Sequence, residues 1–308
     1  KAAKEALEGV SADELHVVNL HQVISPIQDM GIPQSCRISV FLAQEHTGAL
    51  ALVGEEYGLV IVAGTGSHVF GRNREGRRMR IDGLGPVLGD VGSGYHIGYL
   101  GLRAAARGIW HTRHATSLTG KIFDACCKIP DEGNTTAAGT AAKEPASGTI
   151  SKSIDKPFPE CNATPLEIQL REVVKFSLRN NDRSVIASLA GIVDAEAGAG
   201  DAVATNIILY AASQMAENIR DLTDNLQIGG DRYVMVGTGS VSMKSDLYWE
   251  HLCKLVKVFA PGLEPMRSPL PPVAGLGLLG LLRLEGIDRF KVRSALFNSV
   301  REYLLRIN

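Results

Sequence analysis

A four-residue motif, Gly-Thr-Gly-Ser, occurs twice in this chain, each time directly after a run of apolar residues. The first copy, at 64–67, follows Leu-Val-Ile-Val-Ala, and the second copy, at 237–240, follows Tyr-Val-Met-Val. Glycine lets a backbone come close to an anion and present its N–H groups, and Thr and Ser hydroxyls can donate further hydrogen bonds. Two tight turns without a ligand are the simpler alternative. The repetition favours a site that handles a phosphate or a nucleotide.

A second glycine-rich segment covers residues 83–94 and has the sequence GLGPVLGDVGSG. Its backbone can approach a ligand closely because so many of its residues lack a side chain. Asp90 is the only charged residue in it. A lone carboxylate there could bind a ligand hydroxyl or a hydrated metal ion, or it could cap the helix that follows. Both interpretations stay open at the level of the sequence.

Several motifs that would indicate other chemistry are absent. The chain has no G-x-x-x-x-G-K-[ST] phosphate loop and no G-x-S-x-G element of the serine hydrolases. Its five cysteines form no C-x-x-C pair, so their spacing indicates neither zinc nor an iron–sulfur cluster. The arginines at 72, 74, 77, 78 and 80 predict a solvated turn, with a phosphate contact by Arg72 or Arg80 as the alternative.

The composition is that of an ordinary globular protein. The chain has 308 residues, with 45% hydrophobic and 21% charged residues and a formal net charge of −1. Without a surplus of positive charge, a general nucleic-acid or membrane-surface binder is not expected. We find no run of the roughly 18 apolar residues that a membrane span needs and no apolar signal segment at the start. A cytoplasmic location is predicted.

Strands and helices alternate along the chain, which predicts an α/β fold with a largely parallel sheet. Strands are expected at 37–42, 59–63 and 233–236, a hairpin at 68–82, and helices at 50–54, 97–110, 118–127, 166–178, 183–193, 202–222, 246–258 and 292–304. Asp201 stands where the N-cap of the 202–222 helix should be. The small, polar composition of residues 128–165 predicts a flexible insertion.

Four segments, in this order, resemble the N-acetylglucosamine kinase family and the related BadF/BadG/BcrA/BcrD-type ATPases. They are residues 58–105, which include GLVIVAGTGS and DGLGPVLGDVGSGYHIGYLGLRAA, and then IASLAGIVDAEAGAGDAVA, VGTGSV and PLPPVAGLGLLGLL. The resemblance implies an actin-like ATPase fold, in which two ribonuclease H-like domains close on ATP. Residues 1–56 and 298–308 are then expected to be the remnant of an N-terminally truncated small domain. Residues 57–297 would form the large domain.

The resemblance also implies roles for individual residues. The nucleotide-binding residues would be Gly64, Thr65, Gly66, Ser67, Ala190, Gly237, Thr238, Gly239, Ser240 and, in an expected turn at 274–277, Gly275. The substrate-binding residues would be Glu45, Gly83, Leu84 and Asp90, and Glu45 would also be the catalytic carboxylate. ATP and Mg²⁺ would be required, and no metal ligand is assigned. A homodimer is left open.

The chain departs from the family pattern at several of these positions. Glu45 stands where the family has Asp, and Val91 stands where it has Glu. The family's Asp-Gly-Gly-Gly-Thr phosphate loop does not occur in the sequence. The expected activity is ATP-dependent phosphorylation of an amino sugar, most plausibly of N-acetylglucosamine to its 6-phosphate. A sugar- or nucleotide-binding protein without catalysis, or an ATPase that activates another enzyme, are the alternatives.

Overall fold

The computed structural model describes residues 44–110, 115–128 and 182–282, together with positions 170, 171, 173, 174, 176, 294 and 298. The elements in chain order are α3 (Glu45–Val53), β1 (Gly58–Ala63), β2 (Ser67–Arg72), β3 (Arg78–Asp82), α4 (Gly94–Gly108), α5 (Leu118–Lys128), α7 (Arg183–Ser188), α8 (Ala190–Gly198), α9 (Ala202–Leu226), β4 (Tyr233–Thr238), α10 (Gly239–Lys244), α11 (Asp246–Phe259), β5 (Leu263–Arg267) and α12 (Pro272–Leu282). The predicted strand at 37–42 and nearly all of the predicted insertion and C-terminal helix lie outside the described residues.

The strands form a five-stranded sheet in the order β3-β2-β1-β4-β5. β1 and β4 are parallel, as are β4 and β5, but the β1–β2 and β2–β3 pairs are antiparallel. The sheet is therefore mixed rather than largely parallel, because strands joined by short turns can pair only in antiparallel fashion. The 68–82 hairpin is confirmed, whereas β5 was not predicted.

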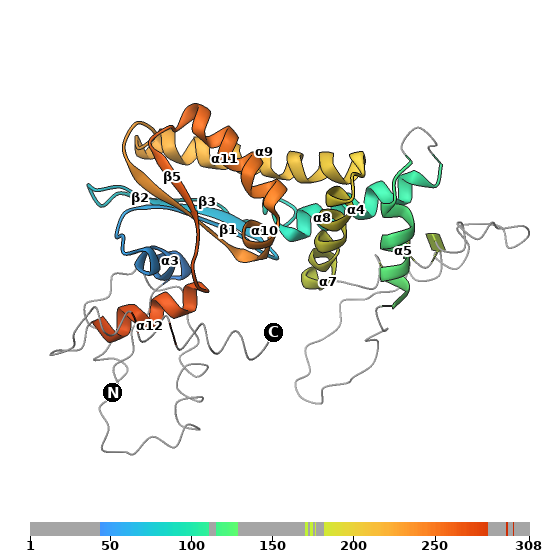
Figure 1. Ribbon diagram of the computed structural model, residues 1–308, viewed down its shortest axis with the longest axis horizontal. Helices are drawn as coiled ribbons and strands as arrows, with labels where there is room; N and C mark the ends of the chain where they lie inside the picture. The colour runs from blue at the N-terminus through green and yellow to red at the C-terminus, as the bar shows by residue number, and fades with distance from the viewer. Residues whose placement is uncertain are drawn as a thin grey trace, which may run out of the picture.

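The two faces of the sheet bury alternate residues of β1. Leu59 and Ile61 belong to the main core, which includes residues of α9 and α11, whereas Val60 packs with Leu50 of α3. Successive side chains of a strand point to opposite faces, so this apolar run is buried on both sides. Figure 1 shows α9 and α11 above the sheet and α3 below it, with α4, α5, α7 and α8 at one end.

The longest helix, α9, begins as predicted. The Asp201 carboxylate accepts the backbone N–H of Ala204 at 2.9 Å and so caps the helix. The same carboxylate also accepts hydrogen bonds from Thr116 and Ser117, in the loop before α5. Asp201 therefore links the loop before α5 to the first turn of α9.

Helices α3 and α12 cross closely on the lower face of the sheet (Figure 1). A Cβ atom at Gly275 would overlap the carbonyl group of Gly48, so the crossing needs glycine at 275. The prediction of a turn at 274–277 is wrong, since these residues lie inside α12. Because α3 precedes residue 56 and yet packs on the sheet, it contacts the large domain directly. The predicted division into domains otherwise stays a prediction.

Candidate functional site

The two Gly-Thr-Gly-Ser segments lie against each other at the carboxyl ends of β1 and β4. These neighbouring strands are parallel, so their ends meet at the same edge of the sheet. Gly239 has a φ of +83°, and a Cβ atom there would lie 2.5 Å from the carbonyl of Ala63. Only glycine combines that backbone conformation with so close an approach. The two turns therefore pack directly against each other.

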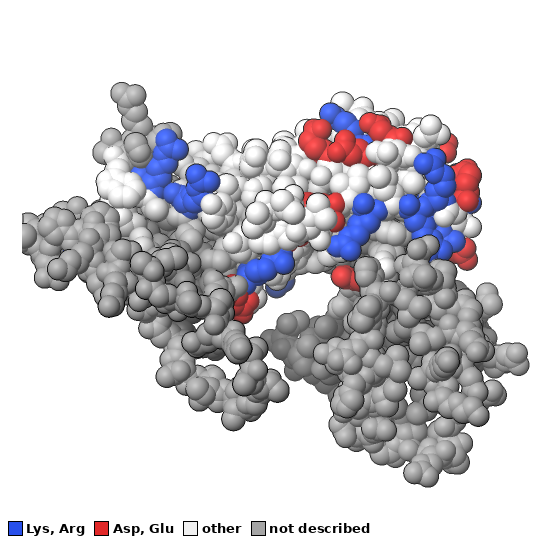
Figure 2. Space-filling view, turned by 180° about the vertical axis from the view of Figure 1, so that it is seen from behind, with Lys and Arg blue, Asp and Glu red and all other residues white. Residues whose placement is uncertain are grey.

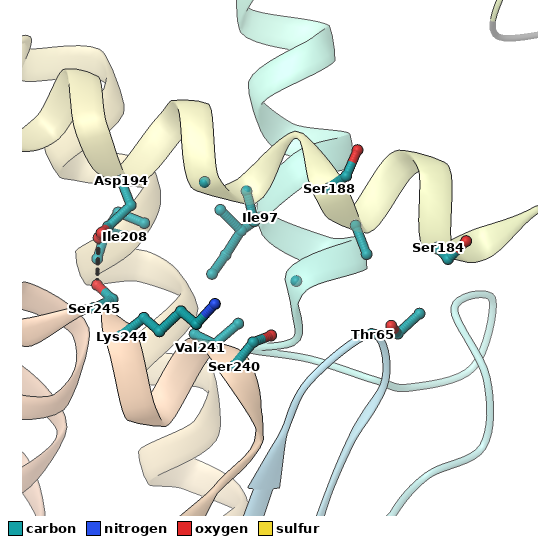
Figure 3. Close-up of a pocket in the computed structure, with 14 residues that line it drawn as sticks. Thr65, Ile97, Ser184, Ser188, Asp194, Ile208, Ser240, Val241, Lys244 and Ser245 are labelled. Carbon is teal, nitrogen blue, oxygen red and sulfur yellow. Dashed lines mark hydrogen bonds between the residues drawn. The ribbon is translucent and has the colours of Figure 1, made fainter. Parts of the chain in front are cut away.

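A cavity of about 330 Å³ opens beside these turns. Figure 3 shows Thr65, Ser240 and Lys244 on one side of it, with the amine of Lys244 pointing inward. Ser184 and Ser188 of α7 lie on the other side. The apolar side chains of Ile97, Ile208 and Val241 also line it. The lining is therefore mixed, with hydroxyl, amine and carboxylate groups beside apolar side chains.

Helix α8 forms part of the wall of this cavity. The predicted residue Ala190 lines it, and so does Gly191, where an added Cβ atom would meet no atom within 4 Å. The missing side chain at Gly191 therefore leaves room for a ligand. Asp194, further along α8, hydrogen-bonds the Ser245 hydroxyl and closes one end of the cavity (Figure 3).

The first turn is held on the start of α4 and keeps two backbone N–H groups without a protein acceptor among the described residues. Gly94 and Tyr95 donate their N–H groups to the carbonyls of Gly64 and Thr65, at 2.7 and 3.2 Å, and so hold the turn on the start of α4. Among the described residues, no acceptor is paired with the N–H groups of Thr65 or Gly66. Unpaired, convergent N–H groups form a concavity suited to an anion. The turn can therefore bind phosphate oxygens.

Other members of the two motifs serve the fold rather than the cavity wall. The Ser67 hydroxyl donates to the Val91 carbonyl at 2.7 Å, and the buried Thr238 hydroxyl donates to the Ile61 carbonyl at 3.2 Å. A Cβ atom at Gly237 would overlap the ring of Trp249. Gly275 lies at the crossing of α3 and α12 and lines neither this cavity nor the one described next.

A second cavity, of about 440 Å³, continues from the first. It is lined by the first turn, by Arg80, by Gly83 and Gly85, by Asp90 and by residues 182–184. Thr65 and Ser184 line both cavities, so the two spaces meet there. The structure therefore brings the phosphate turn, the nucleotide-side residues and Asp90 together, as the sequence predicts. Leu84, by contrast, is 67% exposed and does not line the second cavity.

Asp90 is buried at the base of the second cavity. Its carboxylate accepts the Ser67 N–H at 3.2 Å and forms an ion pair with Arg183. The alternative role as a helix cap is wrong, because Ser93 caps α4 by accepting the His96 N–H at 3.1 Å. The Asp90 carboxylate is therefore placed for a ligand and for Arg183.

Asp82 organises the glycine-rich loop and was not identified from the sequence. Its carboxylate accepts the N–H groups of Gly83, Asp90 and Val91 at 2.7, 2.6 and 3.0 Å. It also accepts the Asn218 amide of α9 at 3.1 Å. Asp82 has a φ of +70°, which is uncommon for a residue with a side chain. The sequence feature that could have identified Asp82 is the Asp-Gly pair that it forms with Gly83 at the end of a strand.

Glu45 is the first residue of α3 and lines neither cavity. Its side chain is exposed, although desolvation by the surrounding protein raises its pKa. The next residue, His46, stacks on Phe70 of β2, with the ring centroids 3.3 Å apart. Burial, together with the charges of His68, Arg78 and Arg80, lowers the His46 pKa to about 3. Helix α3 thus begins close to the cationic side of the second cavity.

The predicted basic turn is mostly structural. Arg72 lies over the Tyr57 ring, and Arg74 lies over the Tyr233 ring and donates to the Arg232 carbonyl. Of the arginines in the hairpin, only Arg80 lines the second cavity, so the phosphate contact proposed for Arg72 is not supported. On the face in Figure 2, the described Lys and Arg residues form small separate groups.

We find no group of three or more His, Cys, Asp or Glu side chains fit to hold a metal ion within the described residues. The same part of the chain contains no helix that is both long and apolar enough to span a membrane.

Residues 29–275 match the model of the BadF/BadG/BcrA/BcrD ATPase family. The chain belongs to this family. Its relatives include an N-acetylmuramic acid/N-acetylglucosamine kinase of Clostridium acetobutylicum, 24% identical over 220 residues, which cover 70% of this chain and 59% of the relative. An N-acetyl-D-glucosamine kinase of Dictyostelium discoideum is 26% identical over 229 residues, which cover 74% of this chain and 60% of that relative. The alignments thus span about three fifths of each relative.

The fold is shared with a solved structure. A candidate N-acetylglucosamine kinase from Chromobacterium violaceum superimposes with a TM-score of 0.52 at 19% identity, covering 86% of this chain and 73% of that one. At this identity the likeness concerns the fold alone. Together with the family match, it confirms the predicted actin-like ATPase fold class.

Proposed function

We propose that this protein transfers the γ-phosphoryl group of ATP to a hydroxyl of an amino sugar, with N-acetylglucosamine and its 6-phosphate as the expected substrate and product. One observation supports this above the others. The cavity beside the paired glycine turns and the cavity around Asp90 meet at Thr65 and Ser184. A nucleotide in the first and a sugar in the second would therefore place donor and acceptor side by side, which is most of what phosphoryl transfer requires.

Different residues of this chain bind each of the two substrates. The N–H groups of Thr65 and Gly66 donate to phosphate oxygens, while Ala190, Ser240 and Lys244 lie along the nucleoside. Asp90 accepts a hydrogen bond from a sugar hydroxyl. Glu45 stays the predicted base for the attacking hydroxyl, although it lines neither cavity in this structure. Mg²⁺ bound to ATP would offset charge on the phosphate oxygens.

The names of the relatives suggest which sugars to compare. One relative is named for both N-acetylmuramic acid and N-acetylglucosamine, and the other for N-acetylglucosamine alone. Both N-acetylglucosamine and N-acetylmuramic acid should therefore be compared as acceptors. The cytoplasmic location and the homodimer stay predictions.

The test is ADP release by the full chain with MgATP, measured with and without each sugar. The proposal expects release that depends on the sugar, together with a phosphorylated sugar detected by mass spectrometry. Glu45→Gln should lower kcat about a hundredfold or more, as expected for loss of a general base, and still bind the sugar. Binding of sugar and nucleotide without any product would instead support the non-catalytic alternative. ADP release that no sugar increases would support an ATPase.

A further inference from the structure

The guanidinium group of Arg183 lines the second cavity, next to Asp90 and near the first glycine turn. Arg183 is the first residue of α7 and pairs through Nη2 with the Asp90 carboxylate. The same Nη2 atom would lie 3.2 Å from a Cβ atom placed on Gly66. A single cationic group therefore pairs with the Asp90 carboxylate and lies near the first glycine turn.

The exposure of the two partners differs in a way that leaves Arg183 open to a ligand. The Asp90 side chain is 5% exposed, whereas the Arg183 side chain is 43% exposed and lines the second cavity. Guanidinium is always protonated in proteins and has five N–H donors in a planar fork. The contact with Asp90 uses Nη2, so donors remain that can reach a bound anion.

The negative charge of Asp90 is unfavourable for a phosphate nearby, and the positive charge of Arg183 compensates for it. A buried carboxylate next to the phosphate turn repels a γ-phosphate that must approach an acceptor hydroxyl in the same space. The positive charge of Arg183 offsets the charge of Asp90. The Arg183 guanidinium also lies next to the space that the transferring phosphoryl group would occupy. Preorganised donors have their largest effect where negative charge develops in the transition state.

We propose that Arg183 is a catalytic residue, whose guanidinium contacts the transferring phosphoryl group while it stays paired with Asp90. This inference rests on the proposed function. The acceptor hydroxyl oxygen forms a bond to the γ-phosphorus as the bond from that phosphorus to the β–γ bridging oxygen breaks, and ADP leaves with that electron pair. The hydroxyl proton passes to solvent, either directly or through the predicted base Glu45. Arg183 donates hydrogen bonds to the equatorial phosphoryl oxygens throughout and exchanges no proton.

The first experiment compares Arg183→Gln and Arg183→Lys with wild type in steady-state kinetics. Arg183→Gln should lower kcat about a hundredfold and change the KM for either substrate only a few-fold, as for loss of a transition-state donor. Arg183→Lys keeps the charge without the fork and should retain part of the lost kcat. Arg220→Gln is the matched control, because Arg220 is 46% exposed and paired with Glu217 on α9, away from both cavities.

Two results would overturn the assignment. An unchanged kcat for Arg183→Gln, or an effect on the sugar KM alone, would mean that Arg183 only positions Asp90 or the fold. Added guanidinium should restore part of the turnover of Arg183→Gly, and a failure to restore any would also argue against direct contact.

A binding experiment separates this inference from the proposed function. Beryllium fluoride with ADP mimics a γ-phosphoryl group, so Arg183→Gln should weaken calorimetric binding of ADP–beryllium fluoride about tenfold and leave ADP binding unchanged. An equal effect on both ligands, or on neither, overturns the role of Arg183 at the phosphoryl group. If wild type instead binds both ligands but releases no ADP with any sugar, the proposed function fails independently.

Discussion

The backbone N–H of Asp90 donates to the Asp82 carboxylate at 2.6 Å, so one acidic residue holds another in place. Both lie in the left-handed region of the backbone, with φ values of +70° for Asp82 and +56° for Asp90. Uncommon conformations of this kind persist only where surrounding contacts enforce them. Here the contacts are the hydrogen bonds that converge on Asp82 from the loop and from α9. The position of the Asp90 carboxylate thus depends on Asp82.

Replacing Asp82 should therefore weaken binding of the acceptor more than binding of the nucleotide. Asp82→Asn removes the charge that accepts several N–H groups, and hydrogen bonds to charged groups contribute about 1.5–3 kcal/mol each. We expect the KM for the sugar to rise about tenfold or more and the KM for ATP to change little. Asp221→Asn is the control, since Asp221 is an exposed carboxylate on α9. Equal effects on both substrates would contradict this role.

Filling the first cavity at Gly191 should reduce ATP binding without unfolding the protein. A Cβ atom at Gly191 meets nothing within 4 Å, so Gly191→Leu should place its side chain in the space that the nucleotide needs. Overfilling a site costs about 1–3 kcal/mol, which corresponds to roughly five- to 150-fold weaker ATP binding in calorimetry. Gly198→Leu lies in the same helix, is equally unobstructed and lines neither cavity. If both variants bind ATP equally well, Gly191 does not face the nucleotide.

The contact between the two glycine turns can be tested by stability alone. Gly239 and Gly76 both have a φ of +83°, but only Gly239 has other backbone atoms where a Cβ atom would lie. Gly76→Ala should lower the free energy of unfolding by about 1–2 kcal/mol, the cost of the left-handed conformation. Gly239→Ala should cost clearly more, because the Ala63 carbonyl must also move. Urea unfolding of both variants measures the difference, and equal losses would show that the turns can separate freely.

Acidification should destabilise the protein through the buried histidines of the hairpin side. The pKa of His46 is lowered to about 3 and that of His68 to about 4, mainly because burial disfavours the charged ring. Between pH 6.5 and about 4, the unfolded chain takes up these protons and the folded chain does not. The free energy of unfolding is therefore highest above pH 6.5 and falls as the pH drops, by up to about 1.4 kcal/mol per pH unit for each histidine.

His46→Phe isolates one of these contributions. Phenylalanine can stack on Phe70 in the same place but cannot titrate. Urea unfolding between pH 6.5 and 5 should show a slope against pH that is smaller than that of wild type by about 1 kcal/mol per pH unit. Identical slopes for the two proteins would mean that His46 is not held neutral in the folded state.

The sequence by itself determined the features that depend on neighbouring residues. The apolar runs before each Gly-Thr-Gly-Ser, the polar hairpin turn and the N-cap Asp201 each appear where local patterns place them. Strand β5 escaped prediction because LEPMR has no alternation and contains a proline, which an edge strand tolerates. It is a strand because β4 offers it backbone hydrogen-bond partners, and not because its own residues favour one.

Only the tertiary structure decided which of the candidate residues share a site. Parallel pairing of β1 with β4 places the two turns together, and the fold places Arg183 on Asp90 and Asn218 on Asp82. The crossing of α3 and α12, likewise, moves Gly275 away from the cavities. Hydrogen bonds and ion pairs between residues far apart in the chain leave no periodic trace in the sequence, because their partners are chosen by packing and not by spacing.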